Sequence, residues 1–403
     1  MISESILPLR GDQLKVNIEK EVKARFLVMM AMGIGDAVAV GLSAIDQIIK
    51  NEPEADGRID VVCNDLQADI FSYDPRIHSI ICIDDSFFPA LNISSLDTGI
   101  VLKPEAIKLI HLLRDRHYEG IFPGNTSPLF YGRLQAPIMQ MGVLNLFKDY
   151  MSLRSLGDIP VSHITRRTVN AFFGNRLAES AIDEEIPLYI TTHHIQKAVT
   201  VIENLKNQSS VSGRQSQPVM VAPDTSSIIT RPPTDLLARG IADALRRNQH
   251  IDVYILPGYT NRDAARNLYE SLSPSFSGRI FMISPEPPLS VLDTTALIDQ
   301  AEIFITGDTG TMHLAVAFKI LVEKESGYSV RNSRKVIALF GGTNPGLHGY
   351  SKQTIILGRG RKEQSAVIPG IFKEAYNGKE RNFFDHIAPH ELTDAILSQL
   401  EIE

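Results

Sequence analysis

Strand-length apolar runs alternate with helix-length amphipathic segments through most of the chain, and this alternation constrains its fold more than any other feature. It is the pattern of βα units, which build parallel sheets with helices on both faces. Most of the apolar runs end at Gly or Pro before the next helix. The sequence therefore predicts an α/β protein of repeated Rossmann-like units. The expected strands lie at 24–31, 58–64, 77–83, 118–124, 217–223, 251–258, 278–284, 301–307 and 334–341.

The length of the chain predicts more than one domain. With 403 residues it is too long for one ordinary domain and suits two of roughly 150 to 200 residues each. Helices are expected near 36–50 and 103–116, and a helix from 195 gives way to a polar segment that ends at 216. We expect a first domain over 1–180, a second over 181–385, and a closing amphipathic helix over 386–403 that packs back across the first domain.

Composition and charge exclude several classes of function. Hydrophobic residues make up 43% and charged residues 22%, which is typical of a soluble globular protein. The net charge of -7 offers no basic field for nucleic acid. The first residues lack the pattern of a signal peptide, and no window approaches the ~18 apolar residues of a membrane span. We expect a cytoplasmic protein that does not bind nucleic acid.

Cysteine and histidine spacing gives no sign of a metal site. Cys63 and Cys82 lie in strand-like apolar runs without a CxxC pattern, so we interpret both as buried thiols and not as a disulfide or metal pair. His193 and His194 have no third ligand at metal spacing, so we expect them to be structural or to face solvent.

The first stretch that could carry chemistry is "MGIGDAVAV", which follows the first expected strand. Its two glycines, Gly33 and Gly35, resemble the opening of a dinucleotide fingerprint, but Val38 holds the third glycine position and no acidic strand end follows at about 20 residues. Glycines there predict a tight turn that keeps side chains away from a ligand. Asp36 then has two interpretations, an N-cap of the next helix or a catalytic base.

The second stretch, "GDTGTMHLAVAF", runs from a strand end into a helix. Small residues there expose backbone N–H groups at a helix N-terminus, where an anion such as a diphosphate is favoured. Asp308 is expected to accept hydrogen bonds from hydroxyls or backbone donors, or to act as a cap. His313 either contacts a phosphate or hydroxyl or is an ordinary core histidine.

The third stretch, "FGGTNP", also follows a strand and offers backbone donors at Gly342 and a hydroxyl at Thr343. Ligands of open parallel sheets bind where loops leave the carboxyl ends of the strands. Since this loop lies one βα unit after the second stretch, we expect both loops to converge on one crevice.

Together these three stretches resemble the glycosyltransferase family of the ADP-heptose:lipopolysaccharide heptosyltransferases, with the motifs in the family's order. The resemblance implies a GT-B fold, in which two Rossmann-like domains with parallel sheets face a central cleft. It implies an acceptor held mainly by the first domain and a nucleoside-diphosphate sugar held mainly by the second. The implied reaction is an inverting, metal-independent glycosyl transfer without a cofactor, in lipopolysaccharide biosynthesis or a related pathway.

The resemblance also implies roles for particular residues. Asp36 matches the family's aspartate that takes the acceptor proton. The loop 221–235 lies where family members have small hydroxyl residues followed by a cation, so Arg231 is the candidate for the diphosphate, with a solvated loop arginine as the alternative. The donor-binding candidates are Thr225, Ser226, Arg231, Asp308, Thr309, Gly310, Thr311, His313, Gly342 and Thr343. The acceptor-binding candidates are Gly33, Gly35, Phe122, Asn125, Tyr131 and Arg133.

Substrates and partners stay broad at this stage. The expected donor is a nucleotide sugar such as ADP-heptose, and the acceptor is a glycan, a lipid-linked molecule or a small molecule, so peripheral association with a membrane is left open. The polar segment 319–335 is longer than the family's link and is interpreted as a partner surface or a lid. The alternative hypotheses are a nucleotide-sugar epimerase or hydrolase, which needs no acceptor, and a non-catalytic nucleotide-sugar-binding protein.

Overall fold

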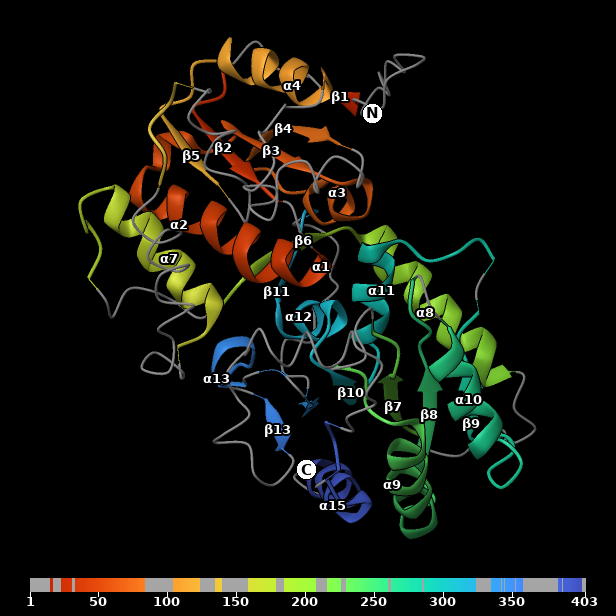
Figure 1. The fold of residues 1–403 in the computed structure, drawn as a ribbon. Coiled ribbons are helices and arrows are strands. Elements are labelled where there is room, and N and C mark those ends of the chain that lie inside the picture. The colour runs from red at the N-terminus through yellow and green to blue at the C-terminus, as the bar shows by residue number, and fades with distance from the viewer. Residues whose placement is uncertain are drawn as a thin grey trace. The chain divides into compact units, whose positions relative to one another are not determined.

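Two mainly parallel sheets, one in each of two units, organise the chain in the computed structural model (Figure 1). The first unit comprises Met1–Ser152 and Val161–Tyr189, and the second comprises Leu153–Pro160 and Ile190–Glu403. The structure describes residues 15–16, 23–30, 33–83, 104–123, 135–139, 159–178, 185–207, 216–225, 230–259, 262–284, 286–323, 335–341, 343, 345–351, 353–357, 383–385 and 387–400.

The sheet of the first unit has five strands in the order β1-β4-β3-β2-β5. Its strands are β1 (Lys15–Val16), β2 (Phe26–Met29), β3 (Ile59–Cys63), β4 (Ile77–Cys82) and β5 (Gly120–Phe122). β1 runs antiparallel to β4, while the other pairs are parallel. The helices are α1 (Ile34–Asp36), α2 (Ser43–Asn51), α3 (Asp65–Phe71), α4 (Pro104–Arg114) and α7 (Val161–Phe172), with a π-helical segment at Ala37–Leu42 and a 3-10 turn at Pro53–Ala55.

The second unit contains a six-stranded parallel sheet in the order β13-β12-β10-β7-β8-β9. These strands are β7 (Gln217–Ala222), β8 (Ile251–Ile255), β9 (Ile280–Met282), β10 (Ile303–Gly307), β12 (Lys335–Phe340) and β13 (Thr354–Leu357). A separate two-stranded sheet joins β6 (Pro187–Ile190) and β11 (Phe318–Leu321). The helices are α8 (Thr192–Asn207), α9 (Thr234–Arg247), α10 (Asp263–Leu272), α11 (Val291–Ile298), α12 (Gly310–Val316), α13 (Pro345–His348) and α15 (Pro389–Leu400).

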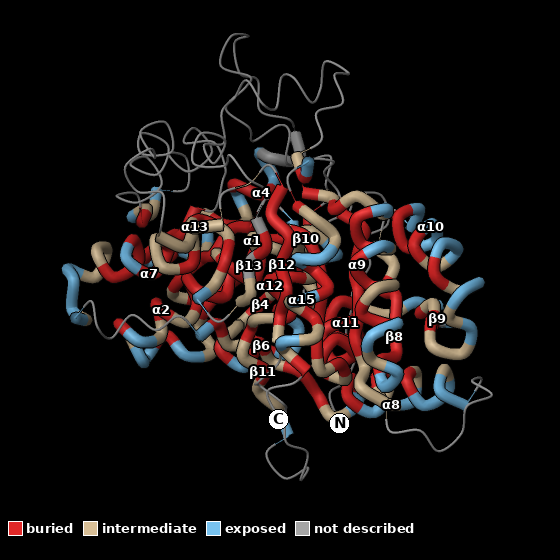
Figure 2. The backbone as a smooth tube through the Cα atoms, turned by 90° about the horizontal axis from the view of Figure 1, so that it is seen from below, coloured by how far each residue is buried: buried red, intermediate tan, exposed pale blue. Residues whose placement is uncertain are grey.

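All nine strands expected from the apolar runs are present, and so are helices at the two ranges expected in the first half. β8 and β10 are buried along their whole length, which explains why they read as continuous apolar runs rather than as alternating patterns (Figure 2). The predicted α/β class with parallel sheets is therefore confirmed.

The closing helix α15 belongs to the core of the second unit. Its buried residues Leu392, Ile396 and Leu400 join the cluster formed by β7, β8 and α9, and α15 lies beside α9 (Figure 1). The apolar face of this helix is thus filled within its own unit, and the expectation that it packs across the first domain is wrong.

The segment 319–335 is partly regular structure. Its first residues complete β11, and Lys335 begins β12. Residues 324–334 lie outside the described part of the chain, so the prediction of a partner surface or lid there stays untested.

Candidate functional site

The strand order of the second unit fixes where a ligand can bind. From β7 the sheet grows in one direction through β8 and β9 and in the other through β10, β12 and β13, so the chain reverses its winding between β7 and β10. Open parallel sheets bind ligands at this switch point, outside the carboxyl ends of the strands. Ala222 of β7 pairs with Thr306 of β10, so the loops that follow these two residues start side by side.

Gly307 shows how closely these two loops approach. A Cβ at this position would lie 2.2 Å from the carbonyl oxygen of Thr230 and 2.9 Å from Cδ of Pro232. The first contact is with backbone, which cannot rotate away as a side chain can. Only glycine allows the 230–232 segment to lie against the end of β10, so the contact joins the loop of Arg231 to the loop of Asp308.

Three threonine hydroxyls gather at the end of β10. Thr306 lies with its Oγ1 3.1 Å from the carbonyl oxygen of Ala222, to which it donates. The hydroxyls of Thr309 and Thr311 are 2.7 Å apart, and Thr306 lies 3.3 Å and 3.4 Å from them. Thr309 is the N-cap of α12, yet its side chain makes no capping hydrogen bond. Of the predicted donor residues, Thr309, Gly310 and Thr311 therefore lie together at this turn.

His313 is held between two side chains in the first turns of α12. Its Nδ1 lies 2.6 Å from the hydroxyl of Tyr350, and its Nε2 lies 3.8 Å from Oδ1 of Asp308. A proton on Nε2, facing the carboxylate, leaves Nδ1 to accept from the tyrosine hydroxyl. The predicted pair Asp308 and His313 is thus brought together, with Tyr350 as a third member.

Burial keeps His313 neutral. Loss of water lowers the pKa of its imidazole from 6.5 to about 4, because desolvation disfavours the charged ring. The carboxylate of Asp308 raises the pKa and His348 lowers it, but both effects are smaller than that of burial. A neutral ring near pH 7 can donate and accept hydrogen bonds without bringing a positive charge.

Arg231 is anchored in the loop after β7. Its Nη2 donates to the carbonyl oxygen of Thr225 at 2.8 Å, and the hydroxyl of Thr230 donates to that of Thr225 at 3.2 Å. Its Nε is buried and has no hydrogen-bond partner among the described residues. Arg231 is therefore a half-buried, positioned guanidinium, and the alternative of a solvated loop arginine is wrong.

Asp224 was missed by the sequence analysis, although it organises the same edge. Its carboxylate accepts three backbone N–H groups, from Gly258 at 3.1 Å, Ala264 at 3.0 Å and Ala265 at 3.3 Å. The last two are in the first turn of α10, whose own N-cap, Arg262, makes no side-chain capping bond. A carboxylate directly after a strand is a signal for such a role, but its partners 34 to 41 residues away cannot be found from local spacing.

The loop after β12 lies next in the sheet, because β12 pairs with β10. The hydroxyl of Thr343 is buried and has no hydrogen-bond partner among the described residues. A buried hydroxyl without a partner is costly unless a ligand or water meets it. Tyr350, from the same loop region, contributes the contact to His313.

In the first unit, Asp36 is the third residue of α1. Gly33 is the N-cap, and no side-chain capping hydrogen bond is present at α1 or at the π-helical segment that follows. Asp36 stands at the N-cap position of the π-helical segment, but its side chain makes no capping hydrogen bond there, so the expected capping role is not found. The carboxylate is half-buried, in the first turn of a helix at the carboxyl end of β2. Because the sheet grows both ways from β2, this end is also a switch point.

Neither glycine of this stretch has a backbone conformation that requires glycine. Gly33 has φ -75° and ψ -178°, a conformation that any residue adopts, and Gly35 lies within α1. A Cβ on Gly33 would meet nothing within 4 Å. Residues 31 and 32 of the expected turn lie outside the described part of the chain, so the prediction of a tight turn stays untested. Gly41 is the glycine with a packing role, since a Cβ there would lie 3.1 Å from Sδ of Met30 and from Cζ of Phe71.

Several other candidates are either unavailable to a ligand or outside the described residues. Phe122 is only 3% exposed within β5, so it is a core residue and not part of an acceptor wall. His194 is buried, and its Nδ1 accepts from the backbone N–H of Thr191 at 3.0 Å, while His193 is exposed. Five predicted site residues lie outside the described part of the chain, namely Asn125, Tyr131, Arg133, Ser226 and Gly342.

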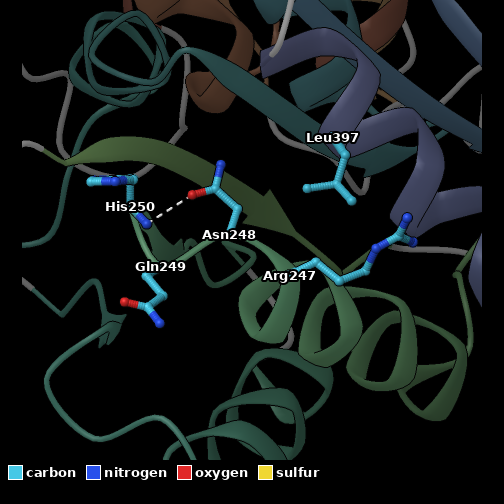
Figure 3. Close-up of a pocket in the computed structure, with 5 residues that line it drawn as sticks. All are labelled: Arg247, Asn248, Gln249, His250 and Leu397. Atoms are coloured by element: carbon cyan, nitrogen blue, oxygen red, sulfur yellow. Dashed lines mark hydrogen bonds between the residues drawn. The ribbon is translucent and has the colours of Figure 1, made fainter.

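The described residues hold no cluster of three or more potential metal ligands. Cys63 and Cys82 form no disulfide and stand side by side in the register of β3 and β4. A pocket of about 480 Å³ lies in the second unit at the amino end of β8, away from the loops above (Figure 3). It is lined by Arg247, Asn248, Gln249, His250 and Leu397.

Comparison with known proteins places these observations in a class. The chain is similar to the crystal structure of a glycosyl transferase family 9 protein from Veillonella parvula, with 13% identity, a TM-score of 0.65, and coverage of 95% of this chain and 99% of that one. It is similar to the E. coli ADP-heptose lps heptosyltransferase II, with 15% identity, a TM-score of 0.56, and coverage of 93% and 98%. It is also similar to the E. coli heptosyltransferase WaaC with ADP, with 14% identity, a TM-score of 0.52, and coverage of 88% of this chain and 99% of that one. No curated protein sequence matches the chain.

The fold defines the structural class: the two units with parallel sheets have the GT-B fold of these glycosyltransferase structures. Residues 239–368 match the family described as "Glycosyltransferase family 9 (heptosyltransferase)". The match includes the turn of Asp308 and His313 and the loop of Thr343, but not the loops of Asp36 or Arg231. Within the described residues, no helix has the length and apolarity needed to cross a membrane.

Proposed function

We propose that the protein transfers a sugar, heptose or a related one, from a nucleoside-diphosphate sugar to a hydroxyl of an acceptor, with inversion and without a metal ion. The observation that carries the proposal is the pairing of two loops at the switch point between β7 and β10, within or beside the residues that match family 9. The similar E. coli proteins are heptosyltransferases, one of them with ADP bound, which supports an adenine nucleotide as the first donor to test.

The donor diphosphate would bind against the loops of Arg231 and Asp308. Arg231 is fixed through Thr225 and keeps its buried Nε without a described partner, so its guanidinium can meet phosphate oxygens. The threonine hydroxyls and the start of α12 add neutral donors. As the bond to the sugar breaks, negative charge grows on the leaving diphosphate, and donors that are already oriented stabilise it.

The acceptor hydroxyl would lose its proton to Asp36. In an inverting transfer the acceptor oxygen forms its bond to the anomeric carbon on the face opposite the diphosphate, whose bond breaks in the same step. A general base contributes about 10²- to 10⁴-fold to such a step. Asp36 is a candidate because its half-buried carboxylate is not used as a helix cap.

The test compares Asp36→Asn with Asp56→Asn, an exposed carboxylate of the same unit. With ADP-heptose and heptose-deficient lipopolysaccharide, we expect Asp36→Asn to lower kcat at least about 100-fold and Asp56→Asn to leave it unchanged. ADP affinity measured by calorimetry should stay the same in both, since Asp36 does not bind the donor. Full turnover in Asp36→Asn would remove the base assignment.

Two further measurements separate the proposed transfer from its alternatives. Asp308→Ala and His313→Ala should weaken ADP binding. Unchanged ADP affinity in both variants would mean that the donor-binding site lies elsewhere. Release of free sugar from ADP-heptose at the full rate without any acceptor would indicate a hydrolase. Turnover that persists in EDTA would support a reaction without a metal ion.

A further inference from the structure

The side chain of Gln67 links two helix starts in the first unit. Gln67 is fully buried in the first turn of α3. It forms a capping box with Asn64, in which its backbone N–H donates to Oδ1 of Asn64 at 2.8 Å and its Oε1 accepts the backbone N–H of Asn64 at 3.2 Å. The amide nitrogen of the same side chain, Nε2, donates to the carbonyl oxygen of Gly33 at 3.1 Å.

The carbonyl of Gly33 is the first acceptor of the helix that carries Asp36. It receives the backbone N–H of Ala37 at 3.1 Å, so the turn of residues 33–37 closes on the oxygen that Gln67 also holds. Gly33 itself is exposed and has no side chain with which to anchor this peptide. The buried amide of Gln67 therefore fixes the position at which the Asp36 helix begins.

We propose that Gln67 is a positioning residue for Asp36. It does not touch the reacting atoms. It acts by holding the Gly33 carbonyl, and through it the first turn of α1, at a set place relative to α3. The inference rests on the proposed function, in which Asp36 is the base. A displacement of about 1 Å in a catalytic group can cost about 100-fold in rate. Loss of this link should therefore lower kcat and leave the affinity for the donor substrate unchanged.

The chain offers a matched pair of variants. Gln67→Met keeps the length of the side chain but removes both the capping acceptor and the donor to Gly33. Asn64→Ala removes the other half of the same capping box and leaves Nε2 of Gln67 able to reach Gly33. Both variants should destabilise the start of α3 to a similar degree, by the loss of a cap. Only Gln67→Met breaks the link to the Asp36 helix.

The first readout does not depend on turnover. Hydrogen exchange of the backbone amides over 34–40 should speed up about tenfold or more in Gln67→Met and stay unchanged in Asn64→Ala. Equal exchange in both variants would overturn the proposal, because Gln67 would then be a helix-capping residue only. If Gln67→Met does not fold, Gln67→Leu is used instead, since it also lacks the donor to Gly33 and brings no charge into this buried position.

The second readout is kcat with ADP-heptose and heptose-deficient lipopolysaccharide. We expect Gln67→Met to lower kcat about 10- to 100-fold with the KM for ADP-heptose within twofold, and Asn64→Ala to keep kcat within twofold. In the Asp36→Asn background, adding Gln67→Met should not lower kcat any further. An active Gln67→Met beside an inactive Asp36→Asn would overturn only the role of Gln67. An active Asp36→Asn would overturn the proposed base and the positioning role together.

Discussion

Among single residues, His313 carries the clearest electrostatic signature. Its ring lies near a carboxylate, which by itself would favour the protonated form, yet burial outweighs that attraction and lowers the pKa of His313 to about 4. The hydroxyl of Tyr350 satisfies one ring nitrogen without adding charge. The donor loop therefore keeps a neutral imidazole beside the carboxylate of Asp308.

This shift predicts how stability depends on pH. An unfolded histidine binds its proton near pH 6.5 and the folded His313 only near 4, so between these values the unfolded state holds more protons. The free energy of unfolding should then be highest above pH 6.5 and fall by about 2 kcal/mol on going to pH 5. Urea unfolding at pH 7 and pH 5 measures the difference, and His313→Gln should reduce it. An equal pH dependence in His313→Gln would contradict the assignment.

Residue-level prediction from the sequence succeeded where the partners are local. Asp308 and His313 stand five positions apart and were predicted as parts of one turn, which the structure bears out. Tyr350 and Asp224 were missed because their bonds join positions more than 30 residues apart, and no periodicity encodes such contacts. Asp36 was placed after the correct strand, but only the structure could show that its side chain makes no capping hydrogen bond.

Between elements, the contact of α9 with α15 closes the core of the second unit. Gly240 of α9 lies under this contact, because a Cβ there would be 2.9 Å from both Cδ2 of Leu392 and the carbonyl oxygen of Pro389. The hydroxyl of Thr393 donates to the carbonyl of Gly240 at 2.9 Å. The two helices thus approach through a position where no side chain fits.

Gly240→Ala tests whether the close contact of α9 and α15 outweighs the gain in helix propensity. In an exposed helix, replacing Gly by Ala stabilises by about 1 kcal/mol, whereas forcing a Cβ into a filled contact costs about 1–3 kcal/mol. We expect the cost of the clash to exceed the gain in helix propensity, so that the free energy of unfolding falls. Ser398→Ala, on the exposed side of α15, should change it by less than about 0.5 kcal/mol. A more stable Gly240→Ala would show that α15 moves away at little cost.

The pattern of apolar residues predicted most of the helices and strands. It was a poorer guide to which elements pack against each other. β6, β11 and β13, with four residues each, were not predicted, whereas the three-residue strands β5 and β9 were, so strand length did not decide which strands the pattern revealed. The pattern of α15 showed one apolar face but could not show that α9 covers it. Strand order was likewise not predicted, although it is what brings the loops of Arg231 and Asp308 together.

For the whole molecule, the division into two units predicts which part of the chain a bound nucleotide protects from hydrogen exchange. The donor candidates described above all lie in the second unit, and Asp36 lies in the first. Hydrogen exchange with and without ADP should therefore show added protection over 217–225 and 303–316, with none over the strand 59–63. A bound ligand stabilises only the part of a protein that forms its site. Protection confined to the first unit would contradict the assignment of the donor loops.

The short strand β1 pairs antiparallel with β4, Lys15 opposite Cys82 and Val16 opposite Ile81. Without it, β4 would be the outer strand of its sheet, with the apolar sequence "IHSIIC". Such a strand presents a row of unsatisfied backbone groups that another chain can pair with. β1 covers the end of this edge at Ile81 and Cys82, and so limits pairing with another chain there. An affinity tag that displaces β1 should therefore promote association of copies of the chain through β4.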